Sequence, residues 1–91
     1  MRRLQWNYYA WEDYCQWQRT DKAGLKRINL LIRDIMRDPF GGIGKPEPLK
    51  ENLSGFWSRR IDDKNRLIYR IAGPEPGVVE VISCRDHYGD K

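Results

Sequence analysis

The spacing of hydrophobic and polar residues changes near residue 7, where a strand-like pattern gives way to a helical one. Over residues 2–7, Leu4 and Trp6 alternate with polar neighbours, and this period of two predicts a short strand with both side chains on one face. Over residues 8–18, apolar side chains return every three or four positions, which predicts a first helix. The chain is therefore expected to open with a strand and a helix.

A second helix is predicted after Thr20-Asp21, because Asp21 can cap the helix N-terminus with its carboxylate. The helix must end near Arg37, since Pro39 disfavours α geometry at Asp38. One apolar stripe runs along it at helical spacing, made of Leu25, Ile28, Ile32, Ile35 and Met36.

The regular pattern stops at residues 39–53. Three Pro and three Gly fall within residues 39–49, which excludes a helix interior or a central strand and predicts an ordered or semi-ordered loop. Strand-like runs then return, separated by turns of polar residues, Gly and Pro. The three predicted strands are residues 56–61, 66–71 and 78–84.

The predicted order is β-α-α-β-β-β, which belongs to the α+β class. We expect two helices packed on one face of a mainly antiparallel sheet, with the other face free to act as a working surface. A chain of 91 residues fits one domain, residues 1–91, and its four Trp, five Tyr and two Phe supply the bulk of a small core.

Charge is distributed unevenly along the chain. Residues 1–70 carry 15 Lys or Arg against 9 Asp or Glu, whereas residues 71–91 carry 2 against 4. An excess of six positive charges over most of a small domain favours a polyanion such as nucleic acid as partner. Many soluble proteins are mildly basic, so charge by itself does not decide the function.

The remaining bulk features indicate a cytoplasmic protein without a membrane partner. No apolar run approaches the length of a membrane span, and no apolar segment follows Arg2-Arg3 as in a signal peptide. The two cysteines, Cys15 and Cys84, are read as small core hydrophobes in a reducing compartment. With one His and no CxxC motif, we expect neither a structural zinc site nor any cofactor.

The candidate functional residues gather in the second half of the chain. Glu47 lies between two prolines, which limit where its carboxylate can point, and His87 is the only histidine. Each residue alone is weak evidence, because loop acids and single histidines are usually structural or solvated. Arg59 and Arg60 are strand neighbours that point to opposite faces, so at most one can face a given site.

Together these residues match the requirements of RNA cleavage by its own 2′-hydroxyl. The reaction needs a base for the 2′-hydroxyl proton, an acid for the leaving 5′-oxygen and positive charge at the phosphate. Glu47 or neutral His87 could be the base, and protonated His87 or Tyr88 the acid. The phosphate could be held by Arg66, Lys50 and Arg60.

At these same residues the chain resembles a known family, the YoeB/Txe toxins of bacterial toxin–antitoxin modules. The resemblance is carried by the run from Pro39 to Ile61, by Arg66-Leu67-Ile68-Tyr69 and by the closing Cys84-Arg85 and His87-Tyr88. The opening also fits, and the similarity spans residues 4–88. The turn at residues 73–77 and the last three residues extend slightly beyond the family's usual pattern.

The resemblance implies a RelE-like fold and a ribosome-dependent mRNA endonuclease that cuts the message in the A site of the 70S ribosome. The implied partners there are the mRNA, the 30S subunit and its ribosomal RNA. It also implies a homodimer and inhibition by a YefM/Phd-like antitoxin with a disordered, acidic segment. The implied catalytic residues are Glu47 as base, His87 as acid, Arg66 and Tyr88. Implied phosphate or RNA contacts are Lys45, Lys50, Arg59 and Arg60.

Two other functions stay open at the level of sequence. A toxin of the same fold could inhibit DNA gyrase, as the related ParE-type proteins do, but this would leave His87-Tyr88 and the Pro-Glu-Pro loop without a role. A non-catalytic module could act only by occupying RNA or antitoxin. Such a module would tolerate His87→Gln and Glu47→Ala, which an enzyme would not.

Overall fold

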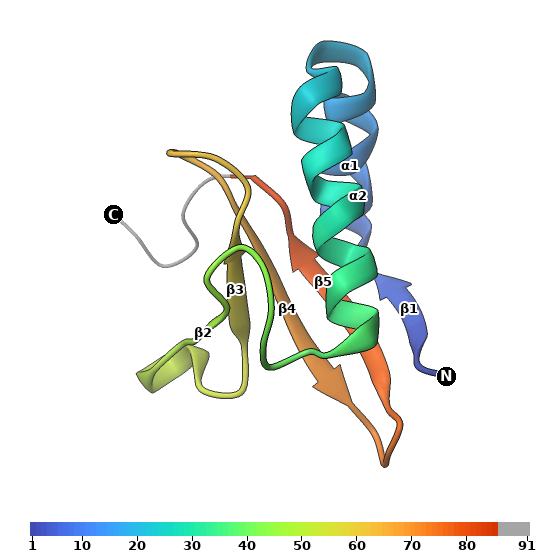
Figure 1. The fold of residues 1–91 in the computed structure, drawn as a ribbon, viewed down its shortest axis with the longest axis vertical. Helices are drawn as coiled ribbons and strands as arrows, with labels where there is room; N and C mark the ends of the chain where they lie inside the picture. The colour runs from blue at the N-terminus through green and yellow to red at the C-terminus, as the bar shows by residue number, and fades with distance from the viewer. Residues whose placement is uncertain (86–91) are drawn as a thin grey trace.

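The computed structural model describes residues 1–85, and Figure 1 shows two helices standing beside a twisted sheet. The elements follow in the order β1 (Arg3–Trp6), α1 (Tyr8–Thr20), α2 (Lys22–Arg37), β2 (Glu47–Pro48), the short 3-10 helix η1 (Glu51–Leu53), β3 (Trp57–Arg60), β4 (Arg66–Ala72) and β5 (Val78–Ser83).

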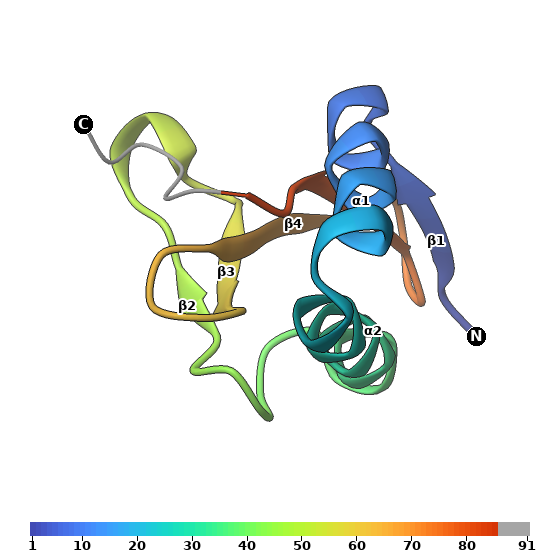
Figure 2. The same ribbon diagram turned by 90° about the horizontal axis from the view of Figure 1, so that it is seen from above.

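The five strands form one sheet in the order β1-β5-β4-β3-β2. β1 runs parallel to β5, and each of the other neighbouring pairs is antiparallel. Seen from above, the sheet extends from β2 to β1, with the helices near its β1 end (Figure 2). The predicted α+β class with a mainly antiparallel sheet is confirmed.

Side-chain hydrogen bonds explain where the helices begin. Asn7 accepts a hydrogen bond from the backbone N–H of Tyr9, and Asp21 accepts one from Gly24. Asp21 is therefore the predicted cap of α2. α2 ends at Arg37, as predicted from Pro39, while α1 continues to Thr20, two residues beyond the expected end.

The core lies between the two helices and one face of the sheet. That face is built by alternate residues of the strands, so the odd-numbered side chains of β3 and β4 point towards the helices. The buried cluster contains Ala10, Trp17, Ile28, Leu31, Ile35, Ile61, Leu67, Tyr69, Val79, Val81 and Cys84. Both helices thus cover the same face, as the sequence predicts.

The segment predicted as a loop, residues 39–53, contains a short strand. Glu47 and Pro48 pair with Ser58 and Trp57 of β3, which makes β2 a two-residue edge strand. Proline lacks an N–H donor and is tolerated at a sheet edge, so the proline-rich sequence is compatible with this position. In the described part of the chain, neither helix is long and apolar enough to cross a membrane.

Candidate functional site

The sheet face opposite the helices carries several of the predicted site residues. Glu47 of β2 lies beside Ser58 of β3, which in turn lies beside Ile68 of β4. In the next row, Arg60 of β3 lies opposite Arg66 of β4. Directly opposed residues of an antiparallel pair point to the same side, so Glu47, Arg60 and Arg66 share this open face.

Glu47 and Arg66 approach each other across that face. Nη1 of Arg66 lies 3.9 Å from Oε1 of Glu47, and the two side chains are 24% and 63% exposed. This separation is longer than a hydrogen bond, so the two charged groups are close but are not hydrogen-bonded to each other. A carboxylate and a guanidinium are therefore both presented to solvent at one place.

Arg60 adds a second positive charge in the row of Arg66. Nη2 of Arg60 lies 3.9 Å from Oδ1 of Asp63, whose side chain is fully exposed, so this pair is weak. Arg70 lies farther along β4 on the same face, but its Nε donates to Glu80 at 2.6 Å. Arg60 and Arg66 are therefore better placed than Arg70 to attract an anion.

Lys45 and Lys50 are both exposed and flank β2. Lys45 lies two residues before Glu47, in a left-handed backbone conformation with φ 53°. Lys50 caps η1 in an extended conformation. Both predicted RNA contacts thus lie close along the chain to Glu47.

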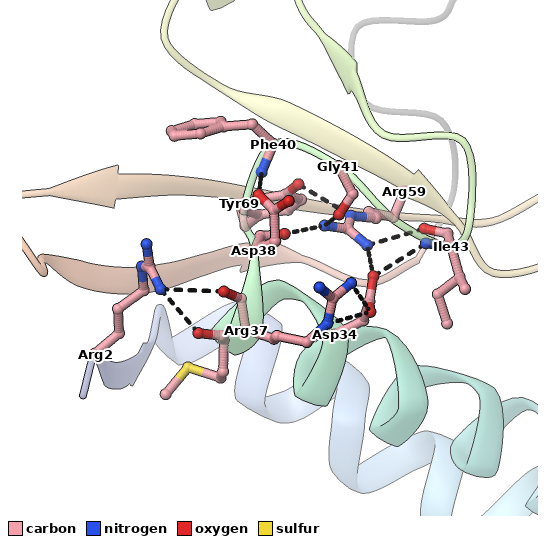
Figure 3. Close-up of polar contacts among 10 residues, drawn as sticks. Arg2, Asp34, Arg37, Asp38, Phe40, Gly41, Ile43, Arg59 and Tyr69 are labelled. Atoms are coloured by element: carbon pink, nitrogen blue, oxygen red, sulfur yellow. Dashed lines mark hydrogen bonds and ion pairs between the residues drawn. The ribbon is translucent and has the colours of Figure 1, made fainter.

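The prediction that Arg59 contacts RNA is wrong, because Arg59 is 0% exposed. It lies on β3 between Ser58 and Arg60, and strand alternation turns its side chain to the helix side. Its guanidinium donates to the carboxylate of Asp34 at 2.6 Å and to the hydroxyl of Tyr69 at 3.1 Å (Figure 3). A polyanion cannot reach this group without unfolding the site.

Sequence reasoning missed Asp34 and Ser58. Hydrogen bonds from Arg37 and Arg59 lower the pKa of Asp34 from 3.8 to about 2, so this carboxylate stays charged. Ser58 is 1% exposed, and its Oγ has no hydrogen-bond partner within the described residues. In the sequence, Asp34 is one of several polar residues of a predicted helix, and Ser58 is a single serine within a predicted strand. No motif or spacing marks either residue as part of a site.

His87 and Tyr88 lie outside the described residues. The chain just before them is held firmly, since Nε1 of Trp17 donates to the Cys84 carbonyl at 2.8 Å. Burial raises the pKa of the Cys84 thiol to about 12, and the Arg85 guanidinium lies 5.1 Å from the centre of a Trp17 ring. Among residues 1–85, no group of three or more His, Cys, Asp or Glu could hold a metal ion.

Comparison with known proteins gives consistent matches across almost the whole chain. Residues 6–88 match the family described as the YoeB-like toxin of bacterial type II toxin–antitoxin systems. Toxin YoeB of Synechocystis is 61% identical over 79 residues, which cover 87% of this chain and 88% of that protein.

Solved structures agree with the sequence matches. The YoeB/ParE toxin from Agrobacterium tumefaciens has a TM-score of 0.90 at 50% identity, covering 94% of this chain and 99% of that one. A YoeB dimer from Staphylococcus aureus has a TM-score of 0.85 at 40% identity, covering 96% of this chain and 98% of that one. A YoeB–YefM complex from Staphylococcus aureus has a TM-score of 0.84 at 38% identity, covering 97% of this chain and 99% of that one. The predicted RelE-like fold is thereby confirmed. The chain belongs to the YoeB-like toxins of bacterial type II toxin–antitoxin systems.

Proposed function

We propose that this toxin is a ribosome-dependent mRNA endoribonuclease that cuts the message in the ribosomal A site and so stops translation. The observation that carries the proposal is the juxtaposition of Glu47 and Arg66, 3.9 Å apart on the open sheet face. When a 2′-hydroxyl attacks the neighbouring phosphate, the first step requires a base and a cation that binds the phosphate. Glu47 and Arg66 supply these two groups at this spacing.

In the proposed reaction, Glu47 takes the proton of the RNA 2′-hydroxyl, and the 2′-oxygen bonds to the adjacent phosphorus. Arg66 stabilises the negative charge that the phosphate develops as this bond forms. The bond from phosphorus to the 5′-oxygen then breaks, which leaves a cyclic phosphate on one fragment. The leaving 5′-oxygen takes a proton from His87, with Tyr88 beside it along the chain. In this proposal, side chains supply the base, the acid and the positive charge.

Lys45, Lys50 and Arg60 are proposed to contact the RNA backbone around the cut. All three side chains are accessible. Lys45 precedes Glu47 in the chain, Lys50 follows it, and Arg60 lies on the neighbouring strand β3. Such contacts release counterions from RNA and make binding sensitive to salt. We expect the affinity for ribosomes to fall steeply between low and high salt.

The relatives suggest the protein partners. Because YoeB of Staphylococcus aureus has solved structures as a dimer and in complex with YefM, we propose that this chain forms a homodimer and binds an antitoxin of the YefM kind. We further propose that residues 1–91 act as one domain in the cytoplasm, where the ribosome is its site of action.

The test is cleavage of mRNA on purified, programmed 70S ribosomes, with naked RNA as control. We expect Glu47→Gln to lower kcat by about 10²- to 10⁴-fold and Arg66→Ala by about 10²- to 10³-fold. Arg70→Ala is the matched control, because it removes a guanidinium from the same strand and face that is already paired with Glu80. It should cleave like the wild type.

The alternatives give different patterns. Equal cleavage of naked RNA would leave a nuclease and remove the ribosome from the mechanism. Absence of cleavage by a wild-type protein that still arrests growth would favour gyrase inhibition or action by occupancy. Full activity of a folded Arg66→Ala variant would remove the phosphate-binding role from Arg66.

A further inference from the structure

The buried guanidinium of Arg59 uses its full set of donors. Nε donates to the Tyr69 hydroxyl at 3.1 Å, and Nη1 donates to Asp34 Oδ2 at 2.6 Å and to the Ile43 carbonyl at 2.9 Å. Nη2 donates to the carbonyls of Asp38 at 2.7 Å and Gly41 at 3.1 Å. A guanidinium has five N–H groups, so each one has an acceptor.

Three of these acceptors are backbone carbonyls of one irregular segment, residues 38–44, which we call the anchored loop. The two side chains that hold Arg59 also hold this loop. Asp34 Oδ2 accepts from the Ile43 N–H at 3.0 Å, and the Tyr69 hydroxyl donates to the Pro39 carbonyl at 2.7 Å. Figure 3 shows the loop wrapped around the guanidinium, with Asp34 closing it from the helix.

The loop fits closely against this polar cluster. Gly42 has φ 124°, and a Cβ added there would lie 1.9 Å from Asp34 Oδ2. Farther along, the Gly44 carbonyl accepts from the backbone N–H of Arg60 at 2.7 Å, which fastens the end of the loop to β3. One conformation of the loop is thus selected by contacts at both its middle and its end.

Stability alone does not explain a buried ion pair at this position. Replacing such a pair by well-packed apolar residues is often neutral or stabilising, because burial removes the water that solvated both charges. An apolar side chain, however, could not satisfy three carbonyls of an irregular segment at once. The cluster therefore specifies the path of the backbone.

That path leads directly to the proposed site. The anchored loop ends at Gly44, Lys45 follows it, and Glu47 lies three residues beyond Gly44. β2 is only two residues long, shorter than a usual strand, and its pairing with β3 is limited to Glu47 and Pro48. β3 carries Arg59 towards the helices and Arg60 towards the open face, so one strand holds both the anchor and the site.

We propose that Arg59 is a positioning residue that, with Asp34 and Tyr69, holds the anchored loop and thereby sets where Glu47 lies relative to Arg66. The proposal concerns catalysis through Glu47 and in that respect rests on the proposed function. Arg59 itself touches no substrate. Its role is to keep the base within reach of the 2′-hydroxyl that it must deprotonate.

The experiment compares wild type with Arg59→Lys, which keeps the positive charge and loses the planar fork of donors. Tyr69→Phe is a second, milder variant that removes only the hydroxyl, in case Arg59→Lys does not fold. Val79→Ala is the control, because it opens the core on β5 without touching the loop cluster. Three readouts are taken: thermal unfolding, amide hydrogen exchange with the backbone amide chemical shift of Glu47, and kcat and KM on programmed ribosomes.

For Arg59→Lys we expect exchange at the Ile43 amide to become about 10-fold faster or more, with a shifted Glu47 amide resonance. We expect kcat to fall by about 10- to 100-fold, with KM changing by less than about threefold, since misplacement of a reacting group acts on the chemical step. Tyr69→Phe should show the same changes to a smaller extent. Val79→Ala should unfold at a lower temperature and leave the Ile43 and Glu47 amides and kcat unchanged.

Results that differ from these expectations would contradict the anchoring of the loop, the positioning of Glu47 or the proposed function. If the Ile43 and Glu47 amides of folded Arg59→Lys or Tyr69→Phe behave as in wild type, Arg59 does not anchor the loop. If they change while kcat stays at the wild-type value, the anchor does not position the base. If wild type itself does not cleave on ribosomes, the proposed function fails, and the Ile43 and Glu47 amides still decide whether Arg59 sets the position of the loop and of Glu47.

Discussion

Replacing Asp34 by Asn should lower the free energy of unfolding, and the size of the loss should depend on pH through the titration of the Asp34 carboxylate. Asp34 accepts from Arg37, from Arg59 and from the backbone N–H of Ile43, so each of these partners is a donor. An Asn amide keeps the size of the side chain but loses its charge, and its NH₂ group would face donors. The folded state loses an interaction that the unfolded chain does not make.

The magnitude follows from the lowered pKa. The hydrogen bonds of Asp34 bring its pKa from 3.8 to about 2. At about 1.4 kcal/mol for each pH unit, this difference corresponds to roughly 2 to 3 kcal/mol. The first of the two partners, Arg37, has a side chain that is 65% exposed, so solvent screens part of the interaction. We therefore expect about 1 to 2 kcal/mol at neutral pH.

The pH window follows from the direction of the shift. Because the folded pKa lies below the unfolded value of 3.8, the stabilisation is complete above about pH 4. It is lost as the pH falls through the folded pKa of about 2. The difference in unfolding free energy between wild type and Asp34→Asn should thus shrink between pH 4 and pH 2.

The assay is urea unfolding of both proteins at several pH values from 2 to 7. A loss of about 1 to 2 kcal/mol lowers the urea midpoint by about 1 M for a domain of this size. Asp63→Asn is the control, since the Asp63 side chain is fully exposed and its ion pair with Arg60 is long, at 3.9 Å. A difference between wild type and Asp34→Asn that is the same at pH 2 and pH 6 would refute the reasoning.

Three further predictions test the packing around the site. Tyr69→Phe should lower the free energy of unfolding by about 1 to 3 kcal/mol in urea titrations, because a buried donor and a buried acceptor lose their common partner. Gly42→Ala should destabilise by more than 1 kcal/mol, since its backbone is left-handed and its Cβ would collide with Asp34; an unchanged melting temperature would contradict the loop geometry. In native protein a thiol reagent should label Cys15 faster than Cys84, whose thiol is 0% exposed and has a pKa raised to about 12 by burial; equal rates, measured by mass spectrometry, would show that Cys84 is not held in the core.

The arrangement of the site could be predicted from sequence only in part. Alternation along β3 separates Arg59 from Arg60, and the structure shows that separation. Arg59 shares its face of the strand with Trp57 and Ile61, and Arg60 shares its face with Phe56 and Ser58. Because an aromatic residue lies on each face, the strand sequence by itself did not decide which arginine faces the helices. The resemblance to known toxins placed both among the RNA contacts, and burial removes Arg59 from that group.

Local rules determined the elements themselves. The cap at Asp21, the stop before Pro39 and the apolar stripe of α2 all act through neighbours within a few residues, and the helix has the bounds that they predict. The turn chemistry after β3 and β4 likewise placed the hairpin strands to within one or two residues.

Only the tertiary structure decided which distant residues meet. Asp34 and Arg59 are 25 residues apart, and their contact depends on how α2 packs against the sheet. Glu47 and Arg66 approach because β2 and β4 flank the same strand, and the parallel pairing of β1 with β5 closes the far side of the sheet. Short-range spacing selects helix or strand, whereas contacts between distant segments depend on the packing of the whole core, which no local pattern contains.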